Sequence, residues 1–173
     1  MSAAAAAREV RAGELHVPTA EAMTGLGRTL AGALRAGDLL VLSGDLGAGK
    51  TTLTQGIGAG LGVRGAVTSP TFVIARVHPA AAGGVSLVHV DAYRLGSLAE
   101  VDDLDLDAGQ AESVTVVEWG RGMAEDLAEA RLELDITRPR AMTSAGEGRT
   151  VRWRAFGDRW AGAGLPGLDE RSA

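Results

Sequence analysis

The chain has 173 residues, a formal charge of −5 and a pI of about 5.2, and with 46% hydrophobic and 23% charged residues it has the composition of one ordinary globular domain. The acidic balance argues against broad electrostatic binding to nucleic acid, which depends mainly on neutralising phosphates. The absence of cysteine excludes disulfides, thiol nucleophiles and cysteine zinc sites. Neither a secretory signal nor an apolar stretch near the ~20 residues of a membrane span is present, so we expect a cytoplasmic protein without membrane contact.

Taken in chain order, the pattern predicts strands that alternate with helices. Residues 14–17 predict a short extended entry, and residues 21–34 a helix with Thr19 as its candidate N-cap. The apolar run at residues 39–42 is typical of a strand buried on both faces, and residues 50–61 predict the helix that follows. Further strands are predicted at residues 72–77, 85–90, 114–117, 132–136 and 151–156. This alternation indicates a three-layer α/β fold around a mostly parallel central sheet, in a single domain.

The sharpest motif lies between the first buried strand and its helix. Gly44–Thr51 reads GDLGAGKT and matches G-x-x-x-x-G-K-[ST] without a mismatch. In such a loop the glycines bring backbone N–H groups to phosphate oxygens, the lysine reaches the β- and γ-phosphates, and the hydroxyl binds Mg²⁺. The motif therefore predicts a P-loop NTPase fold that binds ATP and Mg²⁺. The candidate nucleotide-binding residues here are Gly44, Asp45, Leu46, Gly47, Ala48, Gly49, Lys50, Thr51 and Thr52.

Lys50 is also the single lysine of the chain, because 16 of the 17 basic residues are arginines. Surface charges tolerate the exchange of lysine for arginine easily. A planar guanidinium would not replace a compact ammonium along the phosphates, so the one lysine points to the active site. We expect Lys50 to be exposed on the loop and to contribute little to packing.

Two buried strands end in a carboxylate, Asp91 after LVHV and Glu118 after VTVV. Both acids should lie at the carboxyl edge of the sheet, where ligands of α/β proteins gather. One is expected to hold Mg²⁺, directly or through water, and the other to orient the attacking water, but the spacing does not say which. The structural alternative is that either acid caps a helix or pairs with a nearby arginine.

Other residues are ambiguous by pattern alone. Thr71 follows Pro70 and either offers its hydroxyl to the γ-phosphate, as switch loops do, or belongs to a simple turn. The three histidines have no metal-ligand spacing. His89 is therefore interpreted as a strand histidine rather than a base, although Asp91 is close to it in sequence.

Four strings in this order, GDLGAGKTTL, TSPTF, HVDAYRL and VVEWGRG, resemble the TsaE family of tRNA threonylcarbamoyladenosine biosynthesis proteins, which are small bacterial P-loop ATPases. The resemblance covers about residues 14–156. It implies an ATPase that acts with the proteins TsaB and TsaD and meets tRNA only through that complex. Hydrolysis would then support repeated turnover of the threonylcarbamoyl transfer that TsaD performs.

The resemblance also implies roles for individual residues. Thr51 and Glu118 match the family's Mg²⁺ positions, and Asp91 matches an acid that assists hydrolysis, so with Lys50 the expected catalytic residues are Lys50, Asp91 and Glu118. Trp119 falls on an aromatic position of the nucleotide pocket. A looser alignment adds Thr19 and Arg149 as nucleotide contacts. The tail at residues 157–173 receives no assignment.

Two other functions remain open at this level. A small kinase would pass the γ-phosphate to a metabolite, although no segment resembles the lid that such an enzyme needs. A nucleotide-gated binding module would use ATP to order an interface with negligible turnover, because slow ATPases and switches share the same loop.

Overall fold

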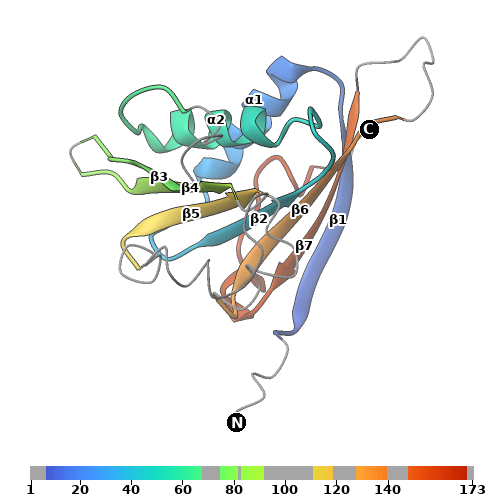
Figure 1. Ribbon diagram of the computed structural model, residues 1–173. Helices are drawn as coiled ribbons and strands as arrows, with labels where there is room; N and C mark the ends of the chain where they lie inside the picture. Colours follow the sequence, from blue (N-terminus) through green and yellow to red (C-terminus); the bar gives the residue numbers. More distant parts are fainter. Residues whose placement is uncertain are drawn as a thin grey trace.

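The computed structural model describes residues 7–67, 75–81, 83–91, 111–118, 128–139 and 148–170 (Figure 1). The elements are β1 (Glu9–Val17), α1 (Ala20–Ala31), β2 (Leu39–Ser43), α2 (Lys50–Leu61), β3 (Ala75–His78), β4 (Ser86–Asp91), β5 (Ser113–Glu118), β6 (Arg131–Thr137), β7 (Arg149–Phe156) and the short 3-10 helix η2 (Asp158–Trp160). The predicted helices and strands are present among the described residues, with ends that shift by a few residues, and the first part of the strand predicted at residues 72–77 lies outside the described residues. The main difference is β1, which begins before the predicted extended entry because it pairs with β7 along its length.

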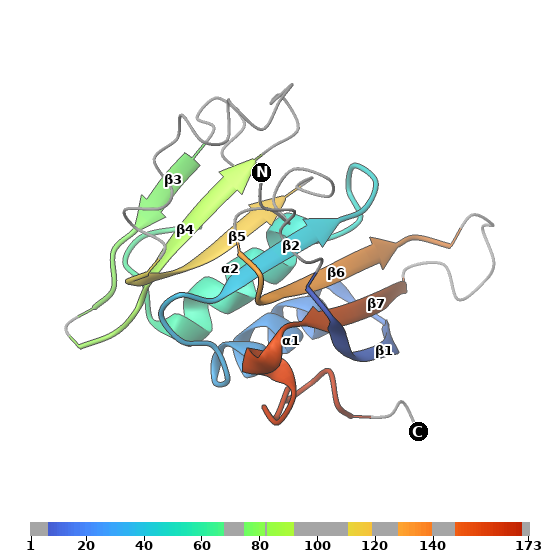
Figure 2. The same ribbon diagram turned by 90° about the horizontal axis from the view of Figure 1, so that it is seen from below.

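The strands form one seven-stranded sheet in the order β1-β7-β6-β2-β5-β4-β3. The four central strands, β6, β2, β5 and β4, pair in parallel, whereas the pairs at both sides are antiparallel. β2 lies in the middle of the sheet, so the loop that leaves its carboxyl end is flanked by the ends of β5 and β6 (Figure 2). The prediction of an α/β fold with a mostly parallel centre is confirmed.

Helix α1 forms because its sequence is amphipathic and well capped. Its buried residues recur with helical spacing at Met23, Leu26, Gly27, Leu30 and Ala31. The predicted cap is confirmed, since the backbone N–H of Ala22 donates to Thr19 Oγ1 at 3.0 Å. Helix α1 therefore begins at a fixed point beside the loop after β2.

Helices α1 and α2 pack closely against each other on one face of the sheet (Figures 1 and 2). A Cβ added at Gly27 would lie 2.3 Å from the carbonyl oxygen of Leu53, and one added at Gly56 would lie 2.2 Å from that of Thr24. Only glycine allows this approach of the two backbones. Gly27 and Gly56 therefore allow α2 to pack directly against α1. This packing also positions the first turn of α2, which follows the loop after β2.

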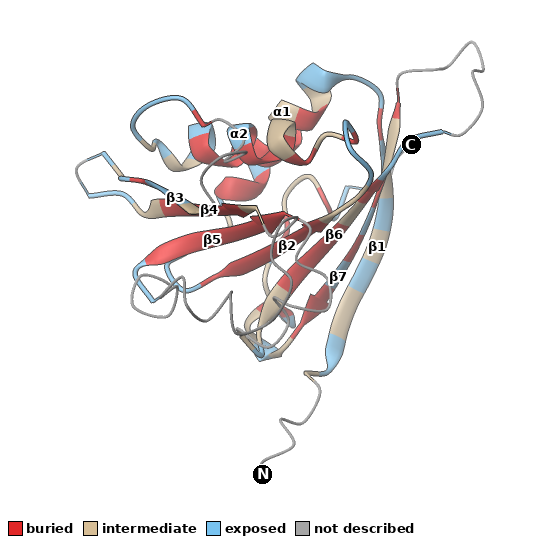
Figure 3. Cartoon of the chain, in the orientation of Figure 1, coloured by how far each residue is buried: buried red, intermediate tan, exposed pale blue. Residues whose placement is uncertain are grey.

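Both faces of the central strands are buried (Figure 3). Leu40 and Leu42 of β2 belong to the core that includes α1 and α2. Leu39 and Val41 point to the opposite face, because side chains alternate along a strand, and they are equally buried. Burial on both faces is what the predicted three-layer arrangement requires.

The segment after β7 belongs to the fold, although its sequence carried no assignment. Trp160, Leu165 and Leu168 are buried in the core. Arg159 donates to both carboxylate oxygens of Asp38, at 2.9 and 2.8 Å. The segment therefore closes the end of the core beneath α1. Among the described residues, no helix is both long and apolar enough to cross a membrane.

Candidate functional site

The loop between β2 and α2 has the backbone conformation that its glycines predict. Gly44, Gly47 and Gly49 have φ angles of 147°, 76° and 117°. A Cβ at Gly44 would lie 2.4 Å from the carbonyl oxygen of Ile136 on β6, so this position excludes every other residue. Helix α2 begins directly afterwards, at Lys50, and its N-terminal end faces the loop with the positive end of the helix dipole. The loop and the N-terminus of α2, which follow the central strand β2, thus form a place where an anion can bind.

Lys50 is buried inside the loop, so the expectation of an exposed lysine is wrong. Its side chain lies across the loop, and Nζ donates to the carbonyl oxygens of Gly44 at 2.8 Å and Asp45 at 3.0 Å. Burial lowers the pKa of the Lys50 ammonium, while the charges of Glu118, Asp91 and Asp45 act in the opposite direction. The loop therefore holds a partly desolvated cation in place, with carboxylates around it.

Thr51 and Glu118 meet although 67 residues separate them in sequence. Thr51 Oγ1 donates to Glu118 Oε1 at 3.1 Å and lies 3.4 Å from Oε2. The reason is the register, since Glu118 ends β5 beside β2, opposite Leu42. The two residues assigned to Mg²⁺ by resemblance are thus adjacent, and Glu118 is buried.

Asp91 ends β4 opposite Glu118, as its position in sequence predicted. It is half-buried, and its charge acts on Lys50 together with that of Glu118. Both strand-end acids therefore lie at one edge of the sheet. Glu118 bonds to Thr51, so its position agrees with the metal-side role that the resemblance implies, and the division of roles between the two acids stays a prediction.

His89 is the residue of this region that sequence reasoning undervalued. It lies on β4 two residues before Asp91, is fully buried, and its Nε2 lies 2.8 Å from Glu118 Oε1. The available signal was the period of the strand, which places residues 87, 89 and 91 on one face. The strand period alone does not show that His89 contacts Glu118, because this contact depends on the pairing of β4 with β5.

On the other side of the loop, a cavity of about 440 Å³ lies between the loop and the start of α1. It brings together Thr19, Thr52 and Arg149, which sequence analysis had assigned to the nucleotide. Thr19 Oγ1 is also used as the cap of α1. Arg138, which follows β6, lines the cavity too and was not anticipated, because no motif marks it. The described residues that line it are Thr19, Ala20, Met23, Gly47, Ala48, Gly49, Thr52, Arg138 and Arg149.

Arg149 contacts the loop backbone in addition to lining this cavity. Its Nε donates to the carbonyl oxygen of Ala48 at 3.0 Å, and its Nη2 donates to that of Gly47 at 3.5 Å. These bonds tie the first residue of β7 to the loop. Arg149 therefore supports the loop from outside, and its predicted nucleotide contact stays a prediction.

The remaining assignments divide into two groups. Asp45 and Leu46 form the exposed outer part of the loop, and the Leu46 side chain is 86% exposed. Thr71 and Trp119 lie outside the described residues, so their predicted roles stay predictions.

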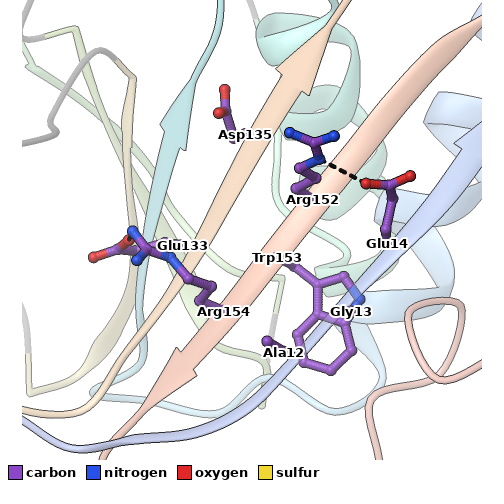
Figure 4. Close-up of a pocket in the computed structure, with 8 residues that line it drawn as sticks. All are labelled: Ala12, Gly13, Glu14, Glu133, Asp135, Arg152, Trp153 and Arg154. Atoms are coloured by element: carbon purple, nitrogen blue, oxygen red, sulfur yellow. Dashed lines mark hydrogen bonds and ion pairs between the residues drawn. The ribbon is translucent and has the colours of Figure 1, made fainter.

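A larger hollow, of about 630 Å³, lies on the sheet face away from α1 and α2 (Figure 4). Four of its charged groups form two pairs: Arg152 Nε donates to Glu14 Oε2 at 2.6 Å, and Arg154 Nη2 donates to Glu133 Oε2 at 2.7 Å. In each pair the two charges on neighbouring strands compensate each other. We therefore assign the site to the loop and not to the larger hollow. The hollow is lined by Ala12, Gly13, Glu14, Glu133, Asp135, Arg152, Trp153 and Arg154.

Comparison with known proteins finds a matching family model, named relatives and a similar solved structure. The family model described as Threonylcarbamoyl adenosine biosynthesis protein TsaE matches residues 17–147, which contain the described site apart from Arg149. The chain is 63% identical over 142 residues to the tRNA threonylcarbamoyladenosine biosynthesis protein TsaE of Streptomyces coelicolor, covering 82% of this chain and 95% of that protein. The Bacillus subtilis protein of the same name is 39% identical over 125 residues, or 72% of this chain and 73% of the relative. The fold is similar to the crystal structure of Bacillus subtilis YdiB, with a TM-score of 0.68 and 29% identity, over 88% of this chain and 91% of that one.

Proposed function

The chain belongs to the TsaE family of threonylcarbamoyladenosine biosynthesis proteins, and from this membership we propose that it is a Mg²⁺-dependent ATPase that serves the N⁶-threonylcarbamoyladenosine modification of tRNA. The observation that carries the proposal is the contact between Thr51 of the phosphate loop and Glu118 of β5. The loop alone would support any nucleotide-binding role. A hydroxyl and a carboxylate that meet beside it supply the side chains that a nucleotide-bound metal needs for hydrolysis.

The donor set at this point fits Mg²⁺. Thr51 Oγ1 and the carboxylate of Glu118 are both oxygen ligands, which Mg²⁺ prefers, and their atoms lie 3.1 Å apart. Mg²⁺ is usually held by one or two protein oxygens together with phosphates and water, so this pair is a sufficient protein contribution. When bound there, the ion would neutralise charge that develops on the β- and γ-phosphates.

The other residues bind and orient the nucleotide. Lys50 places a cation inside the loop, where water is largely excluded and its attraction for phosphate is strong. Arg149 fixes the loop carbonyls of Gly47 and Ala48, which keeps the backbone N–H groups of the loop in place. Asp91, at the end of the neighbouring strand, orients the attacking water. Thr19 and Thr52 line the cavity in which the nucleoside part lies.

We propose further that TsaB and TsaD are its partners and that it meets tRNA only through them, in the cytoplasm. The acidic chain supports this arrangement, because a formal charge of −5 does not favour direct binding to phosphates over a wide surface. ATP hydrolysis would then support repeated turnover of the transfer complex.

Two measurements test the proposal. Phosphate release is measured for the protein alone and with TsaB plus TsaD, and tRNA modification by the same mixture is scored for more than one turnover. We expect Mg²⁺-dependent hydrolysis that the partners change, and repeated modification only when this protein is present. Lys50→Ala is the matched control for a contaminating ATPase. Hydrolysis unaffected by the partners would contradict the proposal, and phosphate appearing on a small molecule would identify a kinase instead.

A further inference from the structure

His89 and Glu118 form a buried hydrogen-bonded pair at the edge of the nucleotide site. The ring of His89 is fully buried and the Glu118 side chain is 4% exposed, with 2.8 Å between Nε2 and Oε1. The pair joins the two neighbouring parallel strands β4 and β5. A polar pair of this kind is costly to bury unless each group satisfies the other.

The chemistry of the two groups decides which of them donates. Thr51 Oγ1 donates to the Glu118 carboxylate, and Oε1 of the same carboxylate lies 2.8 Å from His89 Nε2. A carboxylate oxygen accepts hydrogen bonds, so the donor in the second contact is the Nε2–H of His89. His89 Nδ1 is then an acceptor, and it is buried without a hydrogen-bond partner among the described residues. Among the described residues, the His89 ring therefore has one hydrogen-bond partner, Glu118.

Glu118 is thus held from two sides. Thr51 Oγ1 donates to it from the phosphate loop, and His89 Nε2 donates to it from β4. Glutamate has several rotatable bonds, and two donors on the same oxygen, Oε1, restrict the carboxylate to the orientation that faces Thr51. A valine or leucine, as at the neighbouring strand positions, would fill the space of His89 without supplying this bond.

We propose that His89 is a positioning residue that holds the Glu118 carboxylate toward Thr51, so that the two form a ready-made pair of oxygen ligands for nucleotide-bound Mg²⁺. This inference rests on the proposed function, because it concerns the same metal-side carboxylate. His89 acts through Glu118, to which its Nε2 bonds, and it is not among the described residues that line the nucleotide cavity.

The chain offers a matched control in His78. It is also a buried histidine, on the adjacent strand β3 and only 4% exposed, and its Nε2 has no hydrogen-bond partner among the described residues. In the pairing of β3 with β4, His78 lies opposite Leu87, which is two residues before His89 and on the same face of the sheet. Replacing His78 therefore disturbs a similar environment but leaves the Glu118 contact intact.

The experiment measures the affinity for fluorescent ADP in Mg²⁺ and in EDTA, by titration, without any turnover. For His89→Leu we expect binding in Mg²⁺ to weaken about 10- to 100-fold, the usual effect of losing a group that orients a metal ligand, and binding in EDTA to stay nearly unchanged. His78→Leu should keep the Mg²⁺ dependence of the wild type. Unchanged Mg²⁺ dependence in His89→Leu would overturn the inference, as would an equal loss in His78→Leu.

Two amide variants keep the test decisive if His89→Leu does not fold. The amide nitrogen of His89→Gln reaches about as far as Nε2 and can still donate to Glu118, whereas that of His89→Asn lies near the position of Nδ1 and cannot. We expect His89→Gln to retain most of the Mg²⁺ dependence and His89→Asn to lose it. Equal Mg²⁺ dependence in the two variants would overturn the inference.

The wild-type protein separates this inference from the proposed function. If wild-type affinity for ADP does not depend on Mg²⁺, the proposed Mg²⁺-dependent function fails and the role of His89 fails with it. If the wild type and His89→Leu share a strong dependence on Mg²⁺, only the role of His89 is overturned.

Discussion

The sheet carries two charged regions that differ in burial. At the loop edge, Lys50, Glu118 and His89 are at most 5% exposed and lie around a phosphate-binding backbone. On the outer face of β1, β7 and β6, the side chains of Arg152 and Glu14 are 70% and 54% exposed (Figure 4). Both regions contain short contacts, 2.8 Å for His89 to Glu118 and 2.6 Å for Arg152 to Glu14.

The difference shows that hydrogen-bond length and cavity size do not identify a functional site. Exposed ion pairs contribute little to stability and form wherever opposite charges face each other on a sheet. Buried charges are costly to desolvate, so a cluster of them indicates that the charges are needed there. We therefore propose the smaller cavity beside the buried cluster as the functional one, and the following variants test this contrast.

The largest effect is expected from Lys50→Ala, which removes the buried cation. Nucleotide binding and turnover should fall by at least about a hundredfold, the typical loss when a group that stabilises transferring phosphate is removed. The melting temperature should change little, because the lost packing is offset by removing a charge whose pKa burial lowers.

Lys50→Arg is the matched control, because it keeps the charge but not the compact shape. We expect it to be nearly as inactive as Lys50→Ala, since a planar guanidinium does not fit across the loop. Normal ATPase activity in either variant would contradict the assignment of the phosphate loop.

The two strand-end acids should separate binding from turnover. Asp91→Asn should bind ATP but turn over about a hundredfold more slowly, as expected when a group that orients water is lost. Glu118→Gln should weaken binding in Mg²⁺ about 10- to 100-fold relative to binding in EDTA. Nucleotide titration and single-turnover hydrolysis measure the two effects, and the reverse pattern would exchange the roles of the two acids.

A smaller effect concerns acid stability and the buried His78. Burial lowers the pKa of His78 from its usual value of 6.5, helped by His89 and Arg76. Below pH 6.5 the unfolded chain therefore binds a proton more readily than the folded one, so stability falls as the pH drops toward the folded pKa and is complete above pH 6.5.

Thermal unfolding of His78→Leu between neutral and mildly acidic pH tests this. We expect the variant to lose less stability on acidification than the wild type does. His16→Leu, on the exposed side of β1, should behave like the wild type. An identical pH profile for His78→Leu and the wild type would show that burial of His78 has no consequence for its titration.

The smallest effect is expected on the outer face. Arg152→Gln and Glu14→Gln should leave both the melting temperature and the affinity for ADP unchanged, because the pair is exposed and neither residue is among those that line the cavity beside the loop. Thermal melts and nucleotide titration check this. If a variant binds nucleotide normally but TsaB and TsaD no longer change its ATPase activity, the outer face is a partner surface. The two regions would then differ in what they bind, a nucleotide at the loop and a protein on the outer face.

The sequence by itself determined the phosphate loop and the fold class. Gly44–Thr51 is a local motif whose glycines and lysine act within one turn of chain, and the apolar runs of β2, β4 and β5 indicate buried parallel strands without knowledge of their order. Asp91 and Glu118 were also predictable as edge residues, because each ends such a run.

Only the tertiary structure decided how these residues cooperate. The contacts of Glu118 with Thr51 and His89 join residues 67 and 29 positions apart, through pairings of β5 with β2 and β4 that no local pattern specifies. The support of the loop by Arg149 and the presence of Arg138 in the cavity also bring together residues that are far apart in sequence. Spacing along the chain describes which face a side chain takes, but the register between strands decides which side chains meet.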